Sequence, residues 1–276
     1  MNQNPIDSGR PLLATLVGIV SIAVATSRPG TALSGDTASV VTETDVTLLD
    51  SESEELIGRG YYQVSRSGSS ETIVGENRYL DGESDQEVDH LNLSENGDAI
   101  LESYSHKFLS ADGTPQSIDT LNVMTGVATC TSFRGNERSV REMNLTVSQD
   151  TYAGSAQLLA LSRRLNQGVR EITMHSFICF PGPRIVPVKA TAVAQTRTWP
   201  AQRPDLLNVG ISLDLGWFTH LIDRFTPAAI GLFDPDDDFS YVGGTFDRFY
   251  RRKHVTMQCR RRAVRSVGLS DTKASN

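Results

Sequence analysis

From residue 58 onward, short segments rich in strand-forming residues alternate with tight-turn signals, and this pattern constrains the fold more than any other feature of the chain. Asp81-Gly82 and Asn96-Gly97 separate three such segments. These dipeptides favour hairpin turns because glycine adopts positive φ without steric cost. The segments follow one another at roughly ten-residue spacing, which predicts an antiparallel meander rather than βαβ units.

We therefore expect a mainly β fold: a curved antiparallel sheet, as a half-barrel or open barrel, with one or two short helices packed on it. Leucines at helical spacing predict one helix over residues 152–166, capped by Asp150 or Thr151. A second, short and apolar helix is predicted over residues 215–222, with Asp214 as its cap.

Composition divides the chain into four parts. Residues 1–25 have the pattern of a signal peptide. Residues 26–57 are expected to form an acidic flexible linker, because residues 36–55 contain seven acids and no base. A single β-rich domain is expected over residues 58–262, followed by a disordered tail over 263–276.

The first residues predict export. Residues 11–25 are uncharged and mostly apolar, and they end in Ala-Val-Ala, the small-x-small pattern that signal peptidase cleaves. We expect the mature chain to begin at Thr26, or at Leu33 if a second site is used. The alternative is a membrane anchor over residues 11–27, although a spanning helix needs about 20 apolar residues. A cleaved signal predicts an exported chain that is periplasmic or secreted, and the alternative predicts a chain anchored in the membrane by residues 11–27.

Three cysteines stand far apart in the sequence, without the spacing of a zinc site. An oxidising compartment allows disulfides to form. Our first choice is Cys179–Cys259, because both lie in predicted strands of the second half, and Cys130 would then remain free. The alternative is three buried thiols that act as small apolar side chains.

Charge argues against a nucleic-acid partner. The 276 residues include 33 acids and 26 bases, a net charge of −7, and such a surface would repel a duplex. The C-terminal part is nevertheless basic. It could contact anionic lipid head groups at a membrane surface, meet the chain's own acidic linker, or protect an edge strand from pairing. The six basic residues of interest are Arg251, Arg252, Lys253, Arg260, Arg261 and Arg262.

Enzyme signatures are absent from the sequence. It contains no G-x-S-x-G elbow, no P-loop and no dinucleotide fingerprint. Its five histidines lack the spacing of a metal-binding pair. His106 or His175 could pair with an Asp in space, which the sequence alone does not show. We therefore expect no cofactor, and we assign no catalytic residue.

One acidic cluster has part of a calcium pattern. Asp234, Asp236 and Asp238 alternate as the first three ligands of a calcium loop do. However, Phe239 stands where the loop needs glycine, and Thr245 stands where it needs a bidentate Glu. The alternative interpretation is a solvated acidic turn.

The second predicted helix has too many apolar residues for one face. Such a segment must be buried on several sides or cover a cavity. Ordinary core is one interpretation, and a site for an apolar ligand is the other. The candidate ligand-binding residues are Trp217, Phe218, Leu221 and Ile222.

Three motifs carry a resemblance to a known family. Residues 150–154 (Asp-Thr-Tyr-Ala-Gly), 180–184 (Phe-Pro-Gly-Pro-Arg) and 241–246 (Tyr-Val-Gly-Gly-Thr-Phe) resemble those of uncharacterised exported bacterial proteins. The architecture expected for these proteins is similar to that of half-barrel periplasmic lipoprotein carriers. Over residues 58–262, the resemblance implies a curved sheet wrapped over a helix and an apolar ligand, and it transfers no catalytic residue.

These observations favour an exported binding or carrier protein for a lipid or other apolar ligand at the cell envelope. One competing class is an envelope hydrolase whose site is assembled only in space. The other is a structural or interaction module that uses a sheet edge and the basic terminus.

Overall fold

The structure is a computed structural model. It describes residues 39–135, 137–179, 182–193, 205–214, 229–249, 252–262 and 265–267. These ranges all belong to one compact unit, Thr37–Asn276.

Within these ranges the chain forms one α-helix and sixteen β-strands. The first strands are β1 (Ser39–Asp50), β2 (Leu56–Ser67), β3 (Ser70–Tyr79), β4 (Ser84–Leu93), β5 (Ala99–Leu109), β6 (Pro115–Asn122), β7 (Val127–Arg134) and β8 (Glu137–Asn144). The remaining elements are β9 (Thr151–Tyr152), α1 (Gly154–Asn166), β10 (Glu171–Ile178), β11 (Arg184–Ala192), β12 (Leu207–Leu213), β13 (Ala229–Asp234), β14 (Ser240–Phe249), β15 (Arg252–Arg261) and β16 (Arg265–Val267).

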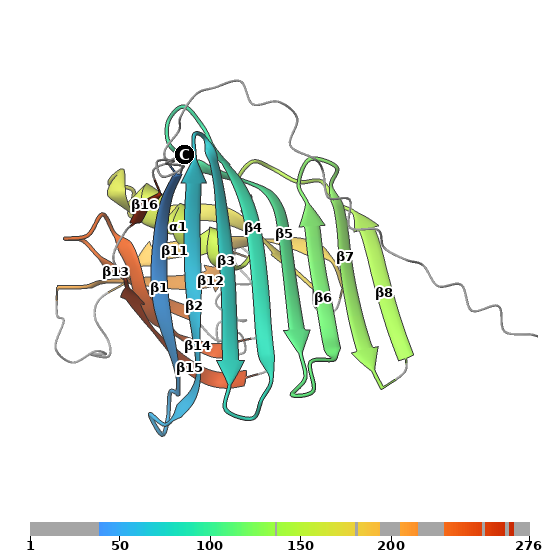
Figure 1. Ribbon diagram of the computed structural model, residues 1–276. Helices are drawn as coiled ribbons and strands as arrows, with labels where there is room; N and C mark the ends of the chain where they lie inside the picture. The colour runs from blue at the N-terminus through green and yellow to red at the C-terminus, as the bar shows by residue number, and fades with distance from the viewer. Residues whose placement is uncertain are drawn as a thin grey trace, which may run out of the picture. The chain divides into compact units, whose positions relative to one another are not determined.

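All these strands belong to one sheet. Its order is β8-β7-β6-β5-β4-β3-β2-β1-β15-β14-β13-β12-β11-β10-β9, and β16 pairs with β1. The chain runs from β1 outward to β8, passes through β9 and α1, and returns from β10 to β15 beside its starting strand (Figure 1). Neighbouring strands are antiparallel except for β9 and β10. The predicted mainly β, curved antiparallel fold is confirmed.

The turn signals act as expected. Gly82 and Gly97, the second residues of the Asp-Gly and Asn-Gly dipeptides, have φ of +89° and +81°. The strands between the turns alternate in burial: β3 and β4 bury every second side chain along most of their length. Each strand therefore has an inner and an outer face.

The acidic linker prediction is wrong for residues 39–50, which form β1. This strand pairs with β2 on one side and β15 on the other. Val46 and Leu48 are buried on its inner face, at alternate positions to the acids Glu43 and Asp45. The acids are thus the outer face of a central strand, so the domain begins before residue 58.

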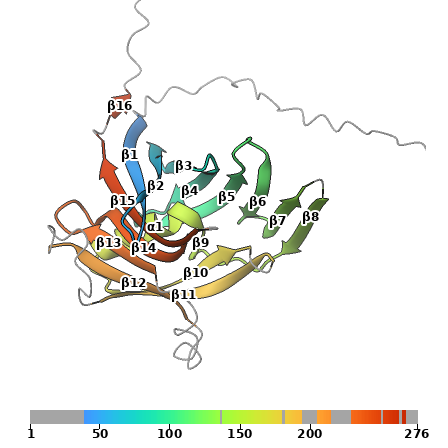
Figure 2. The ribbon, with the colours of Figure 1, turned by 90° about the horizontal axis from the view of Figure 1, so that it is seen from below.

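The helix α1 lies inside the curve of the sheet, where it packs against β4, β5, β10 and β14 (Figure 2). Its buried face consists of Ala156, Ala160, Leu161 and Leu165. The predicted helix was nearly correct in extent, but Tyr152 belongs to β9. Apart from its cap Asp214, the second predicted helix lies outside the described residues.

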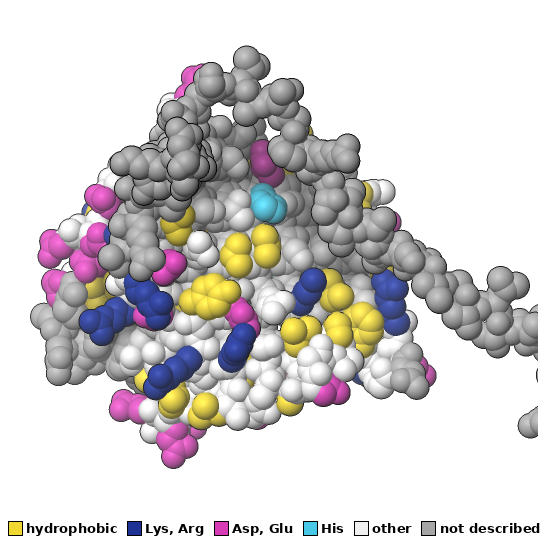
Figure 3. Space-filling model, viewed as in Figure 1, with side chains coloured by type: hydrophobic (Ala, Val, Ile, Leu, Met, Phe, Trp, Pro, Cys, Tyr) yellow, Lys and Arg dark blue, Asp and Glu magenta, His cyan; other side chains and the backbone are white. Residues whose placement is uncertain are grey.

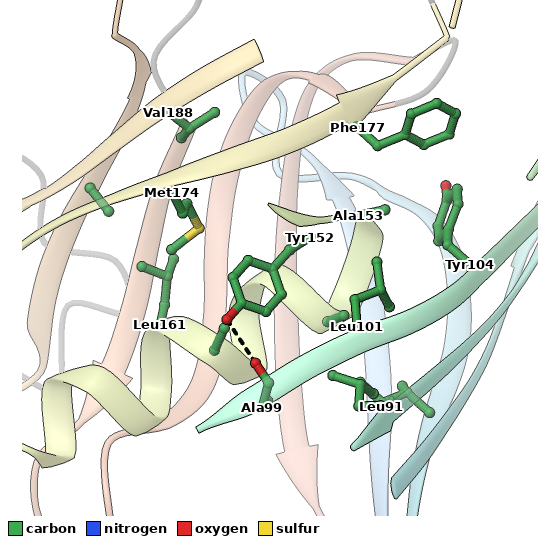
Figure 4. Close-up of a cluster of buried hydrophobic side chains, with 14 of the residues drawn as sticks. Leu91, Ala99, Leu101, Tyr104, Tyr152, Ala153, Leu161, Met174, Phe177 and Val188 are labelled. Atoms are coloured by element: carbon green, nitrogen blue, oxygen red, sulfur yellow. Dashed lines mark hydrogen bonds between the residues drawn. The ribbon is translucent and has the colours of Figure 1, made fainter. Parts of the chain in front are cut away.

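Tyr152 lies at the centre of the main core. Its hydroxyl donates a hydrogen bond of 2.7 Å to the Ala99 carbonyl, so the only polar atom of this buried ring is satisfied (Figure 4). Leu161 of α1 and Met174 of β10 lie beside it, and both are completely buried. Burial of side chains of this size contributes roughly 1.5–3 kcal/mol each.

The outer face is different in character. Figure 3 shows Lys, Arg, Asp and Glu side chains interspersed with hydrophobic ones on the face viewed in Figure 1. Within the described ranges, no helix is long and apolar enough to cross a lipid bilayer. The predicted tail is partly ordered, because residues 265–267 form β16 on β1; the disorder prediction is wrong for these three residues.

Candidate ligand-binding cavity

A single row of side chains crosses the sheet from β2 to β8. Directly opposed residues of an antiparallel pair point to the same face. Glu87 and His106 of this row are buried, so the row lies on the inner face. From β2 to β8 its members are Tyr62, Gly75, Glu87, His106, Asp119, Cys130 and Arg141.

Gly75 has a steric reason for its place in the row. A Cβ atom there would lie 2.5 Å from Cε1 of the Tyr62 ring, so the ring occupies the space that a side chain would need. The row therefore places ionisable groups on the covered face of the sheet. Buried charges are costly unless they are paired or hydrogen-bonded, so each of these groups requires a partner or a shifted pKa.

The N-terminus of α1 supplies partners for two of the acids on β4. The backbone N–H of Ser155 donates to Glu87 Oε1 at 2.6 Å, and that of Ala156 donates to Asp89 Oδ2 at 3.0 Å. The first N–H groups of a helix lack partners within the helix and favour negative charge. The predicted caps Asp150 and Thr151 are wrong: the capping residue is Ala153, which gives no side-chain bond.

Gly154, the first residue of α1, is fitted to this contact. Its φ is +45°, and a Cβ atom there would collide with the carboxylate of Glu87. The close approach of the helix to β4 thus depends on glycine at this position.

Burial perturbs the acids of β4. It is the main cause that raises the pKa of Asp89, and the neighbouring charge of Glu87 adds to it. Burial also raises the pKa of Asp85 to about 7, although Tyr79 donates to its Oδ2 at 2.7 Å and Asn77 to its Oδ1 at 3.0 Å. Those two hydrogen bonds favour the charged form, but desolvation outweighs them.

Beyond the N-terminus of α1, the concave face is hollow. The cavity has a volume of about 1080 Å³ and lies between β5–β8 and the end of β10. Its apolar side chains are Tyr104, Phe108, Phe177 and Ile178. Its charged and hydroxyl side chains are His106, Ser117, Asp119, Thr131, Ser132, Arg134, Glu137, Arg138, Ser139 and Arg141, and a disulfide completes the lining.

His106 and Asp119 are cross-strand partners on the wall of this cavity. Burial lowers the pKa of His106 to about 4, against the opposite influence of the Glu87 charge. Burial raises the pKa of Asp119 to about 6. At neutral pH the imidazole is therefore neutral, and a minor fraction of the Asp119 carboxyl is protonated.

The disulfide joins Cys130 to Cys179, with their α-carbons 5.6 Å apart. The predicted Cys179–Cys259 pair is wrong, and Cys259 is the free cysteine. Curling of the sheet brings the end of β10 across from β7, which sequence spacing does not reveal. A carboxylate oxygen of Asp119 lies within 4.8 Å of both sulfur atoms.

The predicted calcium ligands are only partly brought together. Asp234 and Asp236 form a group with Asp205, with ligand atoms within 4.8 Å of one another, and Asp238 is not in it. Asp234 Oδ1 accepts the backbone N–H of Asp236 at 3.0 Å, an arrangement typical of a local turn. The predicted apolar ligand site, from Trp217 to Ile222, lies outside the described residues.

Two of the predicted membrane-facing bases bind acids of the same chain. Arg261 donates to both carboxylate oxygens of Asp237, at 2.8 and 2.9 Å, and Arg262 donates to Asp45 at 2.7 Å. One of the expected alternatives, contact with the chain's own acidic segment, therefore occurs for Arg262. Arg251 lies outside the described residues, and contact with a membrane stays a prediction.

His175 does meet an acid, but outside the cavity. Its Nδ1 lies 3.1 Å from Asp150 Oδ1 and 3.3 Å from Ser148 Oγ. Both partners approach the same ring nitrogen, whereas a catalytic relay uses both nitrogens of the ring. This contact is suited to fixing the segment before β9.

No family model matches the sequence, and no curated protein matches it. The structure is similar to the crystal structure of a β-barrel-like protein of the domain of unknown function DUF1849 from Brucella abortus. The sequence identity is 12%, the TM-score is 0.45, and the match covers 84% of this chain and 98% of that one.

Proposed function

We propose that this chain is an exported binding or carrier protein that holds an amphipathic anion, a fatty acid or lipid, in the cavity between β5–β8 and β10. The observation that carries the proposal is the composition of the cavity wall. Phe177 and Ile178 offer apolar surface inside, while Arg134, Arg138 and Arg141 are exposed on β7 and β8. Most of the lining residues are polar or charged, and few are apolar, so this wall suits a ligand that carries both an apolar and a charged group.

Charge sets the expected polarity of the ligand. The three arginines outnumber the two acids of the lining, Asp119 and Glu137. Burial raises the pKa of Asp119 to about 6, so most of this carboxyl is still ionised at neutral pH, and the arginines must outweigh its charge to bind an anion. Arginine binds carboxylate and phosphate through paired hydrogen bonds. A ligand whose apolar tail lies inside the cavity and whose anionic group lies at β8 would contact both the apolar side chains and the arginines.

Export and action at the cell envelope belong to the same proposal. They rest on the pattern of residues 1–25, and intact-mass analysis tests them: the mature chain should begin at Thr26. Detection of Met1 in a membrane-extractable protein would support an anchor over residues 11–27 instead.

An envelope hydrolase is the second candidate, favoured by the presence of His106 and Asp119 on one wall. Its difficulty is access, because His106 is only 1% exposed. A general base must come within hydrogen-bonding reach of the proton that it removes. Hydrolysis of an ester panel that is lost in His106→Gln would favour this candidate over the binding protein.

The binding proposal is tested with protein purified without detergent. Native mass spectrometry should detect a co-purified amphipathic anion, whose mass distinguishes a fatty acid from a phospholipid. A dansyl-labelled long-chain fatty acid should then bind in titration. The double variant Arg134→Gln/Arg138→Gln should weaken its binding about tenfold, the equivalent of roughly 1.4 kcal/mol for two charge-assisted contacts.

The matched control is Arg59→Gln/Arg66→Gln, which removes two exposed charges from β2. It should leave the affinity unchanged. The methyl ester of the same probe should bind wild type and both variants equally. Absence of any probe binding, or equal weakening in the two double variants, would contradict the proposal.

A further inference from the structure

The Cys130–Cys179 disulfide has the surroundings of a reactive group, and this goes beyond the proposed binding function. Both cysteines line the open cavity, so a thiol in solution can reach them. Cys130 is 9% exposed and Cys179 is half-buried, which makes the sulfur of Cys179 the more accessible target. Reactivity of a disulfide depends on access and on the stability of the thiolate that leaves.

Two side chains of opposite charge flank the disulfide in the cross-strand row. Asp119 is the partner of Cys130 on β6, and Arg141 is its partner on β8. A cation near a cysteine lowers the pKa of its thiol and makes it a better leaving group. A carboxyl group within 4.8 Å of the sulfurs can exchange a proton with the departing thiolate.

We propose that Cys130–Cys179 is a redox-active disulfide that exchanges with thiols entering the cavity, with Asp119 as its proton-transfer group and Arg141 as a positioning residue. The substrate class is a dithiol or a pair of small thiols. His106 on β5, neutral at pH 7, and Cys130 of the disulfide are the cross-strand neighbours of Asp119, and the charge of Asp119 also acts on Tyr104 of β5.

The exchange balances as two substitutions at sulfur. A substrate thiolate attacks Sγ of Cys179, the S–S bond breaks, and its electron pair leaves on Sγ of Cys130, which takes the proton of the Asp119 carboxyl. The second substrate thiol loses its proton to Asp119 and attacks the mixed disulfide, and Cys179 leaves as a thiolate that takes up from solvent the proton that the first substrate thiol had released there. The substrate is oxidised to a disulfide, and the protein gains two electrons and two protons.

The third cysteine gives an internal reference. Burial raises the pKa of Cys259 to about 12, so its thiolate is scarce at neutral pH. Labelling with a maleimide of known mass, followed by peptide mapping, therefore separates Cys130 and Cys179 from Cys259.

The experiment treats the full chain with reduced glutathione in native buffer and follows labelling of Cys130 and Cys179 over time. Global unfolding is measured in parallel from denaturant kinetics. We expect reduction at least tenfold faster than unfolding. Asp119→Asn should slow it about tenfold near pH 7, and Arg141→Gln should slow it roughly threefold to tenfold.

Two matched controls make the same charge changes without being partners of Cys130: Glu137→Gln in the same cavity, and Arg59→Gln at an exposed position of β2. In both control variants, glutathione should reduce the Cys130–Cys179 disulfide at the wild-type rate. Reduction no faster than unfolding would overturn the proposal and leave a structural cross-link. Equal rates in all four variants would overturn the roles of Asp119 and Arg141. If Asp119→Asn does not fold, the pH dependence of the wild-type reduction rate is measured instead. A rate that does not change near pH 6 would overturn the role of Asp119.

Discussion

The concave face of this sheet has two regions that differ in how they are filled. Beneath α1 lies the packed region, where Tyr152, Leu161 and Leu165 leave almost no surface exposed. Beyond the helix N-terminus lies the hollow region, the cavity lined by β5–β8 and the end of β10. Among the described strands, only β5 and β10 contribute to both regions.

The length of the helix explains the difference. α1 has 13 residues, and at 1.5 Å per residue it is about 20 Å long. Strands lie about 4.8 Å apart, so a helix of this length covers about four of them. The chain runs outward through eight strands, β1 to β8, before α1 begins. One helix cannot fill the whole curve, and the outermost strands are left to face solvent or a ligand.

The largest expected effect on stability comes from the disulfide, which links the strands around the hollow region. The double variant Cys130→Ala/Cys179→Ala should lower the free energy of unfolding by about 4 kcal/mol, because the bond closes a loop of sequence separation 49. Denaturant titration measures it. Cys259→Ala, which changes the free cysteine, should cost about 1 kcal/mol. Equal losses would mean that the walls are held by packing.

A smaller contrast compares side chains of the two regions. Leu161→Ala removes a fully buried side chain from the packed region and should cost about 3 kcal/mol. Ile178→Ala, at a half-buried position on the cavity, should cost about 1 kcal/mol, since solvent already reaches it. Similar losses would indicate that the cavity is filled in solution.

The acids of β4 predict a pH dependence. The pKa of Asp85 is raised to about 7, so its contribution to stability is present below its unfolded pKa and is lost as pH rises through 7. Between pH 5 and 8 this loss is about 2.5 kcal/mol. Asp85→Asn should remove this contribution, while Asp89 and Asp119, whose pKa values burial also raises, keep theirs in both proteins. His106 affects stability in the opposite direction, since its lowered pKa destabilises the fold as pH falls. Its contribution is the same in the wild type and in Asp85→Asn.

The control for this comparison is Asp112→Asn. Asp112 is exposed, and its hydrogen bonds with Ser110 and Thr114 lower its pKa to about 2, so it should leave the pH 5–8 profile unchanged. If Asp85→Asn has the wild-type profile, burial does not perturb Asp85 in solution.

The smallest predicted effect lies at the boundary between the regions. Gly154→Ala should cost about 2 kcal/mol, because it adds a collision with Glu87 to the strain of a positive φ. Gly168→Ala shares the positive φ but has nothing within 4 Å, and it should cost about 1 kcal/mol. Thermal or denaturant unfolding compares the two, and equal losses would place the helix farther from β4.

Much of the fold was predictable from local signals. Turn dipeptides and alternation gave the meander, and leucine spacing gave most of α1. The linker prediction fails at β1 because the number of acids in a segment does not show their alternation: Glu43 and Asp45 lie on one face, and Val46 and Leu48 on the other. An acidic outer face therefore looked like a solvated linker.

The site was less predictable because it depends on register. Glu87, His106, Asp119 and Cys130 come from four strands, and only their pairing places them in one row. One signal was available: Asp85, Glu87 and Asp89 alternate along a strand. Acids at every second position must share a face. The pairing of Cys130 had no such signal, because it results from long-range curling.

Hydrogen–deuterium exchange with and without the fatty-acid probe tests the central claim most directly, that the hollow region holds the ligand. The account predicts added protection in residues 115–144 and 171–179, which surround the cavity, and no change in α1 or β3, whose amides are already covered. Protection centred on α1 or on the outer face of β1–β3, with none in β6–β8, would contradict it.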